Sequence, residues 1–199
     1  MRRKGFFICV EGLDGCGKTT QTKLLVDKLK SGYNAVYTAE PSQGSIGRFI
    51  KEYCLDAEQR VSSVVEALLF AADRCEHVEK VVLPALNDGK LVVSDRYLYS
   101  SLAYQGAAGV DLGWIRQINE HAIKADLAVF IDVFPDTVVQ RLKPKRSVME
   151  NLETQRRVRD VYLRFVENGE LTRIDGNASK ARVGEELLKL VLGFLEKTC

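Results

Sequence analysis

The sequence predicts an α/β fold in which a parallel sheet is covered by helices on both faces. Short apolar runs alternate along the chain with stretches of helical periodicity, as they do in sheets of this kind. A glycine-rich stretch directly follows the first apolar run, and an acidic residue directly follows a later one. The length of 199 residues suits a single domain with a complete core.

Five apolar runs are predicted to be strands. Each is too short for a helix and is bounded by charged or turn-forming residues. In chain order they cover residues 6–10, 35–38, 91–94, 127–133 and 171–174. In parallel sheets, ligands bind beyond the carboxyl ends of the strands. We therefore expect the functional residues just after Val10, Thr38, Ser94 and Val133.

The stretches between the runs are predicted to be helices. Leucines at helical spacing mark 19–30, and Ile46, Phe49, Ile50 and Tyr53 share one helical face. Ser62 or Ser63 can cap a long helix that continues past Cys75. Further helices are expected at 114–124, from Pro135, at 152–166 before Asn168-Gly169, and at 183–195.

Composition argues for an ordinary globular protein of the cytoplasm. The net charge of +2 provides no strong field for a nucleic acid or a membrane surface. The five cysteines are odd in number and lack C-x-x-C spacing, which favours reduced thiols over a disulfide framework or a zinc site. The apolar run 6–10 is too short for a signal peptide, and no segment can span a bilayer. One domain over 1–199 is the simplest prediction.

A phosphate-binding loop (P-loop) is predicted directly after the first strand, where residues 12–19 match G-x-x-x-x-G-K-[ST]. Backbone N–H groups must enclose the phosphates, and glycines leave room for that approach. Lys18 is expected to reach the β- and γ-phosphates, and Thr19 to offer its hydroxyl to Mg²⁺. A strand before and a helix after favour this interpretation over a glycine turn with a surface lysine. The predicted ATP-binding residues are Gly12, Leu13, Asp14, Gly15, Cys16, Gly17, Lys18, Thr19 and Thr20.

Asp95 and Arg96 follow the strand 91–94. A carboxylate there can hold Mg²⁺, directly or through water, so Asp95 and Thr19 form the predicted metal site. Arg96 can bind an acceptor phosphate or neutralise charge during transfer. Taken alone, the pair would be interpreted as a strand-end salt bridge; beside a P-loop the functional interpretation is favoured. The chain lacks the Asn-Lys-x-Asp element of GTPases and is short for a motor ATPase, which indicates a small-molecule kinase.

Several motifs along nearly the whole chain resemble the thymidylate kinase family. They are Phe7-Ile8-Cys9-Val10-Glu11-Gly12-Leu13-Asp14, Glu40-Pro41, Phe70-Ala71-Ala72-Asp73-Arg74, Asp95-Arg96-Tyr97 and Ala103-Tyr104-Gln105-Gly106. The resemblance implies a three-layer P-loop kinase fold with a central five-stranded parallel sheet. It also implies a homodimer that transfers the γ-phosphoryl group of ATP to dTMP with Mg²⁺, giving dTDP and ADP.

The resemblance also implies individual roles at the acceptor site. Asp14 would lie near the 3′-hydroxyl of the sugar, Phe70 would stack on thymine, and Arg74 would bind a base carbonyl. Without the resemblance, Phe70 and Tyr104 would be taken for core residues. The alternative for Arg74 is a solvated helix residue. The implied dTMP-binding residues are Asp14, Glu40, Pro41, Arg48, Phe70, Arg74, Arg96, Ser100, Ser101, Tyr104 and Gln105.

A basic stretch, 141–146, is expected to lie in a lid near 141–151 that closes over the phosphates and excludes water. A solvated loop is the alternative. Because Gly15 stands where some members carry a P-loop arginine, the transition-state cation is expected from the lid, either Arg141 or Arg146. The Asp-Arg-x-Glu element common in that lid is absent, apart from Glu150.

Another departure from the family pattern lies at Ala39, where many bacterial members have arginine. Arg48 or Lys51 is therefore expected to help hold the acceptor phosphate. Because that phosphate is already ionised, catalysis needs no strong general base. Lys18, Arg96 and a lid arginine, with Mg²⁺ held by Asp95, would position the groups and stabilise charge.

Two alternatives remain at this stage. One is a kinase for another deoxynucleotide or a deoxynucleoside. The other is a non-catalytic nucleotide-binding switch, which the presence of both Lys18 and Arg96 disfavours. His77 and His121 have no motif around them and are assigned no catalytic role.

Overall fold

The computed structural model describes residues 5–55, 61–141 and 151–198. Five strands form one parallel sheet in the order β2-β3-β1-β4-β5. The strands are β1 (Phe7–Gly12), β2 (Ala35–Ala39), β3 (Leu91–Asp95), β4 (Leu127–Asp132) and β5 (Thr172–Asp175). The predicted α/β fold with a five-stranded parallel sheet is thus confirmed, and strand ends differ from prediction by one or two residues.

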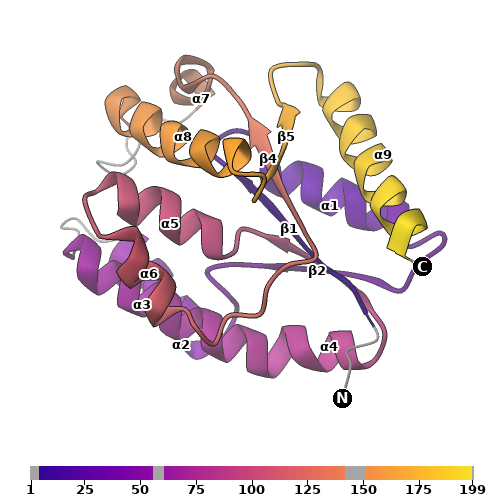
Figure 1. Ribbon diagram of the computed structural model, residues 1–199, viewed down its shortest axis with the longest axis horizontal. Helices are drawn as coiled ribbons and strands as arrows, with labels where there is room; N and C mark the ends of the chain where they lie inside the picture. Colours follow the sequence, from indigo (N-terminus) through magenta and orange to yellow (C-terminus); the bar gives the residue numbers. More distant parts are fainter. Residues whose placement is uncertain (1–4, 56–60, 142–150, 199) are drawn as a thin grey trace.

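Helices cover both faces of this sheet (Figure 1). On one side, α1 (Lys18–Leu29) packs against α9 (Lys180–Thr198). On the other side, α5 (Leu98–Ala107) packs against α8 (Leu152–Glu167) and α3 (Ser63–His77). The remaining helical segments are α2 (Ser45–Ile50), α4 (Leu83–Asn87), α6 (Leu112–Ile118) and α7 (Pro135–Arg141), with π-helical stretches η1 (Lys51–Leu55) and η2 (Val78–Val82).

Strand β1 lies at the centre of the sheet, and every one of its residues is buried. Val10 is the register partner of Asp95 in β3, and Gly12 is the partner of Ile131 in β4. Burial on both faces explains why the parallel strands appear in the sequence as nearly continuous apolar runs. Because neighbouring strands end side by side, the residues that follow β1 and β3 meet at one edge of the sheet.

The helices attach to this sheet through apolar residues at helical spacing and begin at polar caps. In α9, Val183, Leu187, Val191 and Leu195 are buried at intervals of four residues. As predicted, Ser62 caps α3, because its hydroxyl accepts a hydrogen bond from the N–H of Val65 at 3.3 Å.

The region between β3 and β4 differs from prediction. The predicted helix 114–124 is wrong, because α6 begins at Leu112 and ends at Ile118. Nδ2 of Asn119 donates a hydrogen bond to the carbonyl of Ile115 at 2.8 Å, and the chain turns at this residue. Helix α5 was not predicted. Five successive residues in it, Ser101 to Gln105, are buried, so the sequence lacks the alternation of polar and apolar faces that marks a helix.

Residues 142–150 lie outside the described residues, and most of the predicted lid, including Arg146, lies there. The organisation as one P-loop domain over 1–199 with a lid near 141–151 therefore stays a prediction. Among the residues that the structure describes, no helix is both long enough and apolar enough to cross a membrane.

Candidate active site

The P-loop connects β1 to α1 at the carboxyl edge of the sheet, as predicted. Gly15 and Gly17 adopt left-handed φ angles of 83° and 93°, which strongly favour glycine. Gly12 allows a close approach: a Cβ there would lie 2.7 Å from the sulfur of Cys16 and 3.0 Å from the carbonyl oxygen of Ile131. The glycines at these positions keep the loop compact and leave the N-terminus of α1 able to face an anion.

Lys18 and Thr19 open α1 beside the carboxylate of Asp95. Lys18 is buried, and its Nζ donates to the carbonyl of Leu13 at 3.2 Å. The Thr19 hydroxyl donates to Oδ2 of Asp95 at 2.5 Å, and the Tyr37 hydroxyl approaches the same oxygen at 3.4 Å. The register between β1 and β3 accounts for this convergence, because it brings Asp95 next to the strand that ends in the P-loop.

The residues at this point fit Mg²⁺. Asp95 is buried, and its Oδ1 has no hydrogen-bond partner within the described part of the chain. A buried carboxylate oxygen without a partner is costly, and a hard cation is a suitable ligand for it. In the segments 5–55, 61–141 and 151–198, no cluster of three or more His, Cys, Asp or Glu side chains forms a metal site. Thr19, Asp95 and phosphate oxygens would therefore have to share the ion.

Arg96 adopts an unusual backbone conformation, with a φ of 71°. Left-handed conformations are rare for arginine and cluster at functional sites. The guanidinium forms an ion pair with Asp14 of the P-loop, and its Nη1 donates to the carbonyl of Gly12 at 3.5 Å and to Oγ of Ser100 at 2.9 Å. It also lies 5.1 Å from the ring centroid of Tyr104. Arg96 thus joins the P-loop to α5.

Asp14 is anionic at neutral pH. Partial burial would raise its pKa, but the charges of Arg96 and Lys18 and a hydrogen bond with Tyr104 lower the pKa to about 2. The backbone N–H of Asp14 donates to the Tyr104 hydroxyl at 2.9 Å. Asp14, Arg96, Ser100 and Tyr104, which the resemblance assigns to the acceptor site, are therefore brought together.

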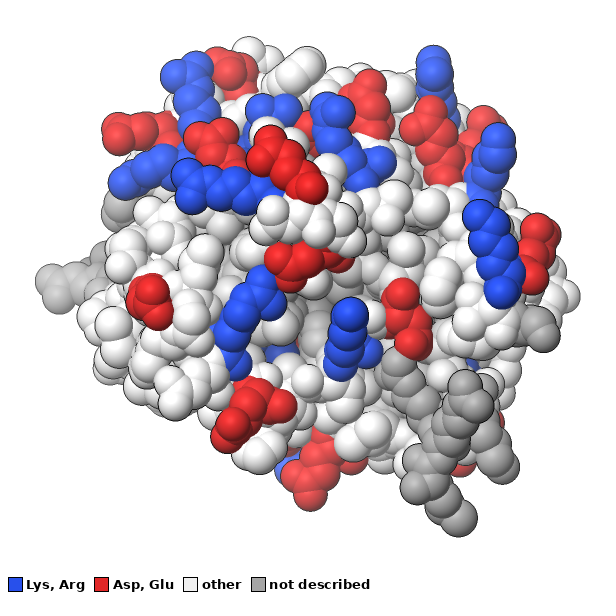
Figure 2. Space-filling view, in the orientation of Figure 1, with Lys and Arg blue, Asp and Glu red and all other residues white. Residues whose placement is uncertain are grey.

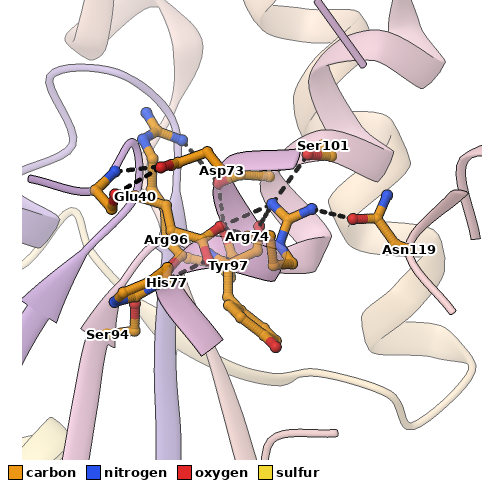
Figure 3. Close-up of polar contacts among 12 residues, drawn as sticks. Glu40, Asp73, Arg74, His77, Ser94, Arg96, Tyr97, Ser101 and Asn119 are labelled. Atoms are coloured by element: carbon orange, nitrogen blue, oxygen red, sulfur yellow. Dashed lines mark hydrogen bonds and ion pairs between the residues drawn. The ribbon is translucent and has the colours of Figure 1, made fainter. Parts of the chain in front are cut away.

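A second group of predicted acceptor residues surrounds Arg74, which is only 1% exposed (Figure 3). Its Nε donates to Glu40 at 3.0 Å, and its Nη2 donates to Ser101 at 3.1 Å and to the carbonyl of Tyr97 at 3.2 Å. Its Nη1 donates to the side chain of Asn119. Arg74 is thus held within a buried network and is not a solvated helix residue.

Two residues of this network had no predicted role. Nδ1 of His77 lies 3.0 Å from the second carboxylate oxygen of Glu40, and its Nε2 contacts the Thr38 hydroxyl. Asn119 is buried where the sequence predicted a continuing helix. These partners come from β2, α3 and the turn after α6, so no local motif in the sequence could have found them.

The other predicted acceptor residues take varied positions. Phe70 is half-buried on α3, one turn before Arg74, and does not belong to the main core cluster. Gln105 is buried; its Nε2 donates to Glu66 at 3.3 Å. Pro41 follows Glu40 through a cis peptide bond. Arg48 and Lys51 donate to backbone carbonyls of the loop before α2, those of Gln43 at 3.0 Å and Ser42 at 2.9 Å.

A cavity of about 240 Å³ lies against the P-loop and involves a loop that the sequence did not single out. Its lining comes from the P-loop and α1, the end of α7, the loop after β5 and the start of α9: Cys16, Gly17, Thr20, Gln21, Arg141, Gly176, Ala178, Lys180 and Val183. The signal that could have found this loop was present, because Gly176 follows the carboxyl end of a parallel strand. Arg141 lies here as the last residue of α7.

Glu11 is a further polar residue that the sequence reasoning did not assign. It is fully buried at the end of β1, and burial raises its pKa to about 7, although hydrogen bonds and the charge of Arg96 oppose the shift.

On the surface, Lys and Arg side chains are interspersed with Asp and Glu, as Figure 2 shows for one face. The site as a whole combines a glycine-rich loop at a helix N-terminus, a buried carboxylate oxygen without a partner among the described residues, and an arginine beside them, an arrangement that suits phosphoryl transfer.

Comparisons with known proteins agree with this chemistry. A family profile described as "Thymidylate kinase" matches residues 10–187. A protein of Pyrococcus abyssi named "Probable thymidylate kinase" is 45% identical over 197 residues, which cover 94% of this chain and 96% of that protein. A protein of Caldanaerobacter subterraneus subsp. tengcongensis named "Thymidylate kinase" is 38% identical over 203 residues, with 97% and 98% covered.

Proposed function

The chain belongs to the thymidylate kinase family and transfers the γ-phosphoryl group of ATP to dTMP, and we propose that the site described above performs this transfer. The observation that carries the proposal is the convergence of Lys18, Thr19, Asp95 and Arg96 at one edge of the sheet. The alternatives, another acceptor or a non-catalytic switch, are not favoured by the family membership.

ATP is proposed to bind along the P-loop, with residues 12–20 enclosing its phosphates. The cavity between the P-loop and the loop after β5 is adjacent to this cradle, and we assign the adenosine part of ATP to it. Mg²⁺ would be held by Thr19 and Asp95, where it would neutralise charge on the phosphates. Arg141 at the rim of the cavity, or Arg146, supplies the lid cation in this proposal.

The acceptor is proposed to bind on the opposite side of Asp14. Arg96 would bind its 5′-phosphate, with Ser100 and Tyr104 beside the guanidinium. The base and sugar would be enclosed by Phe70, Arg74, Ser101 and Gln105. Arg96 is already oriented by Asp14 and Ser100, so little rearrangement is needed on binding. Lys18 and Arg96 would then stabilise the charge that develops in the in-line transfer.

A panel of acceptors tests the proposal. ADP formation is measured with dTMP, dUMP, dCMP and thymidine for the wild type, Lys18→Ala and Lys30→Ala. Lys18 is buried in the cradle, whereas Lys30 lies at the exposed end of the same helix. We expect dTMP to be the best acceptor, Lys18→Ala to lose at least about 100-fold in kcat, and Lys30→Ala to resemble the wild type.

Two outcomes of the panel would contradict the proposal. Turnover with dCMP or thymidine but not with dTMP would overturn the assignment of the acceptor. Full activity of a folded Lys18→Ala protein would overturn the assignment of the cradle.

A homodimer and a cytoplasmic location are also part of the proposal. The α3 helix exposes Val64, Val65 and Leu68, which are 40–48% exposed, and contiguous apolar side chains of this kind mark interaction surfaces. Phe49 and Tyr53 are also exposed, and their stacked rings have centroids 4.9 Å apart. Ile50, between them in sequence, is buried. The described cysteines Cys9, Cys16, Cys54 and Cys75 form no disulfide, which suits the reducing cytoplasm.

A further inference from the structure

Glu11 is a carboxylate in the middle of the buried sheet. It is fully buried, in a strand whose other side chains are apolar apart from glycine. A carboxylate in such a place is costly unless several donors satisfy it. Three donors do so here: the backbone N–H of Tyr97 at 3.0 Å, the Ser100 hydroxyl at 2.6 Å and the Tyr162 hydroxyl at 3.1 Å.

The contact between Glu11 and Ser100 determines how Ser100 meets Arg96. A serine hydroxyl has one hydrogen to donate and two lone pairs with which to accept. Because the Ser100 hydrogen points to Oε2 of Glu11, a lone pair of the same oxygen remains for Nη1 of Arg96, which lies at 2.9 Å. Glu11 therefore acts on Arg96 through one intervening oxygen.

Arg96 has polar partners on two sides. On the P-loop side it pairs with Asp14, and on the α5 side it meets Ser100 and, behind it, Glu11. Without the second side, the pair with Asp14 would draw the guanidinium towards the P-loop. Tyr162 supports the second side, because its hydroxyl donates to Glu11 while its ring stacks on Phe130 at 4.7 Å.

We propose that Glu11, acting through Ser100, is a positioning residue that holds Arg96 in place for the 5′-phosphate of the acceptor. The inference rests on the proposed role of Arg96 as the acceptor-phosphate ligand. It implies a selective effect: loss of Glu11 weakens recognition of the phosphate and leaves recognition of the base and sugar unchanged.

Thymidine and dTMP differ in that phosphate, so their dissociation constants separate positioning from general damage. Both are measured by calorimetry for the wild type, Glu11→Gln, Ser100→Ala and the double variant. At pH 8, above the pKa of about 7 for Glu11, we expect Glu11→Gln to weaken dTMP binding by about tenfold, the size expected when the acceptor of a hydrogen bond loses its charge. Thymidine binding should change by less than about twofold. The double variant should bind dTMP no more weakly than Ser100→Ala, because both changes break one link.

Two tyrosine variants keep the test informative should Glu11→Gln fail to fold. Tyr162→Phe keeps the stacked ring and removes a donor to Glu11, so dTMP should bind about threefold more weakly with thymidine unaffected. Tyr99→Phe is the matched control, because the Tyr99 hydroxyl donates to a different carboxylate, that of Glu170, at 3.4 Å. It should bind both ligands as the wild type does.

The outcomes separate this inference from the proposed function. Equal losses for dTMP and thymidine, or additive losses in the double variant, would overturn the positioning role of Glu11. A wild type that does not turn over dTMP would instead refute the proposed function. An Arg96→Ala protein that binds dTMP as tightly as the wild type would refute the phosphate role of Arg96 itself.

Discussion

At the scale of single residues, Glu11 and Asp14 show how different surroundings give different pKa values to two carboxylates that are close in sequence. Burial raises the pKa of Glu11 to about 7, whereas for Asp14 the charges of Arg96 and Lys18 outweigh burial and lower the pKa to about 2. Both carboxylates flank the same guanidinium. At neutral pH, Asp14 therefore provides a full negative charge to Arg96, and Glu11 provides a titrating one.

Glu11 makes the stability of the fold depend on pH. Its pKa rises from 4.5 in the unfolded chain to about 7 in the folded protein, so its contribution is fully present below pH 4.5 and is lost as the pH rises through 7. Glu11→Gln removes this dependence. Between pH 5 and pH 8, the free energy of unfolding of the wild type should fall relative to the variant by about 3 kcal/mol.

Urea denaturation of both proteins across that pH range measures the difference. Parallel curves for the wild type and Glu11→Gln would contradict the prediction, because they would mean that Glu11 binds its proton equally well in both states.

At the scale of elements, one buried carboxylate helps to hold helix α8 against the sheet. Asp132, at the end of β4, is fully buried and accepts two hydrogen bonds from Arg159 of α8, at 2.6 and 2.9 Å. Arg173 of β5 donates to the same carboxylate at 2.8 Å. One side chain thus joins β4, β5 and the helix that carries Tyr162.

Asp132→Asn should be strongly destabilising, because it leaves two guanidinium groups facing a neutral amide. We expect a loss of about 3 kcal/mol in the free energy of unfolding, measured by denaturant titration. Asp136→Asn is the matched control, since Asp136 is 61% exposed and meets Arg156 at 3.5 Å on the surface. Its cost should stay below about 1 kcal/mol; similar costs for both variants would refute the role given to Asp132.

The elements also show what could be predicted from the sequence. The P-loop and the strands were predictable, because glycine spacing and apolar runs are local signals. Helix α5 was not, since Ser101 to Gln105 are all buried and show no polar face. The end of α6 depends on Asn119, whose side chain meets Arg74 on α3. The contact between Glu11 and Tyr162 joins residues 151 positions apart, and such contacts leave no mark on local sequence.

At the scale of the whole molecule, the two helical layers differ in their exposed apolar residues. Leu68 is 47% exposed on α3, and Leu24 is 39% exposed on α1, which lies on the other side of the sheet (Figure 1). The proposed homodimer uses the α3 face. Leu68→Glu would place a charge in that interface, where an unpaired buried charge is costly.

Sedimentation equilibrium tests this arrangement. We expect the wild type and Leu24→Glu to be dimers, and Leu68→Glu to dissociate at least about tenfold more readily. A monomeric wild type would refute the homodimer, and a Leu68→Glu dimer of unchanged strength would refute the α3 face.

The central place of β1 in the strand order has a consequence for how the polypeptide is made. Strand β1 leaves the ribosome before β3 and β4, with which it pairs and which begin at Leu91 and Leu127. Its neighbours thus emerge long after it, and such distant pairings form slowly. The nascent phosphate loop has neither neighbouring strand in place until β3 and β4 have been translated, and Gly176 emerges later still.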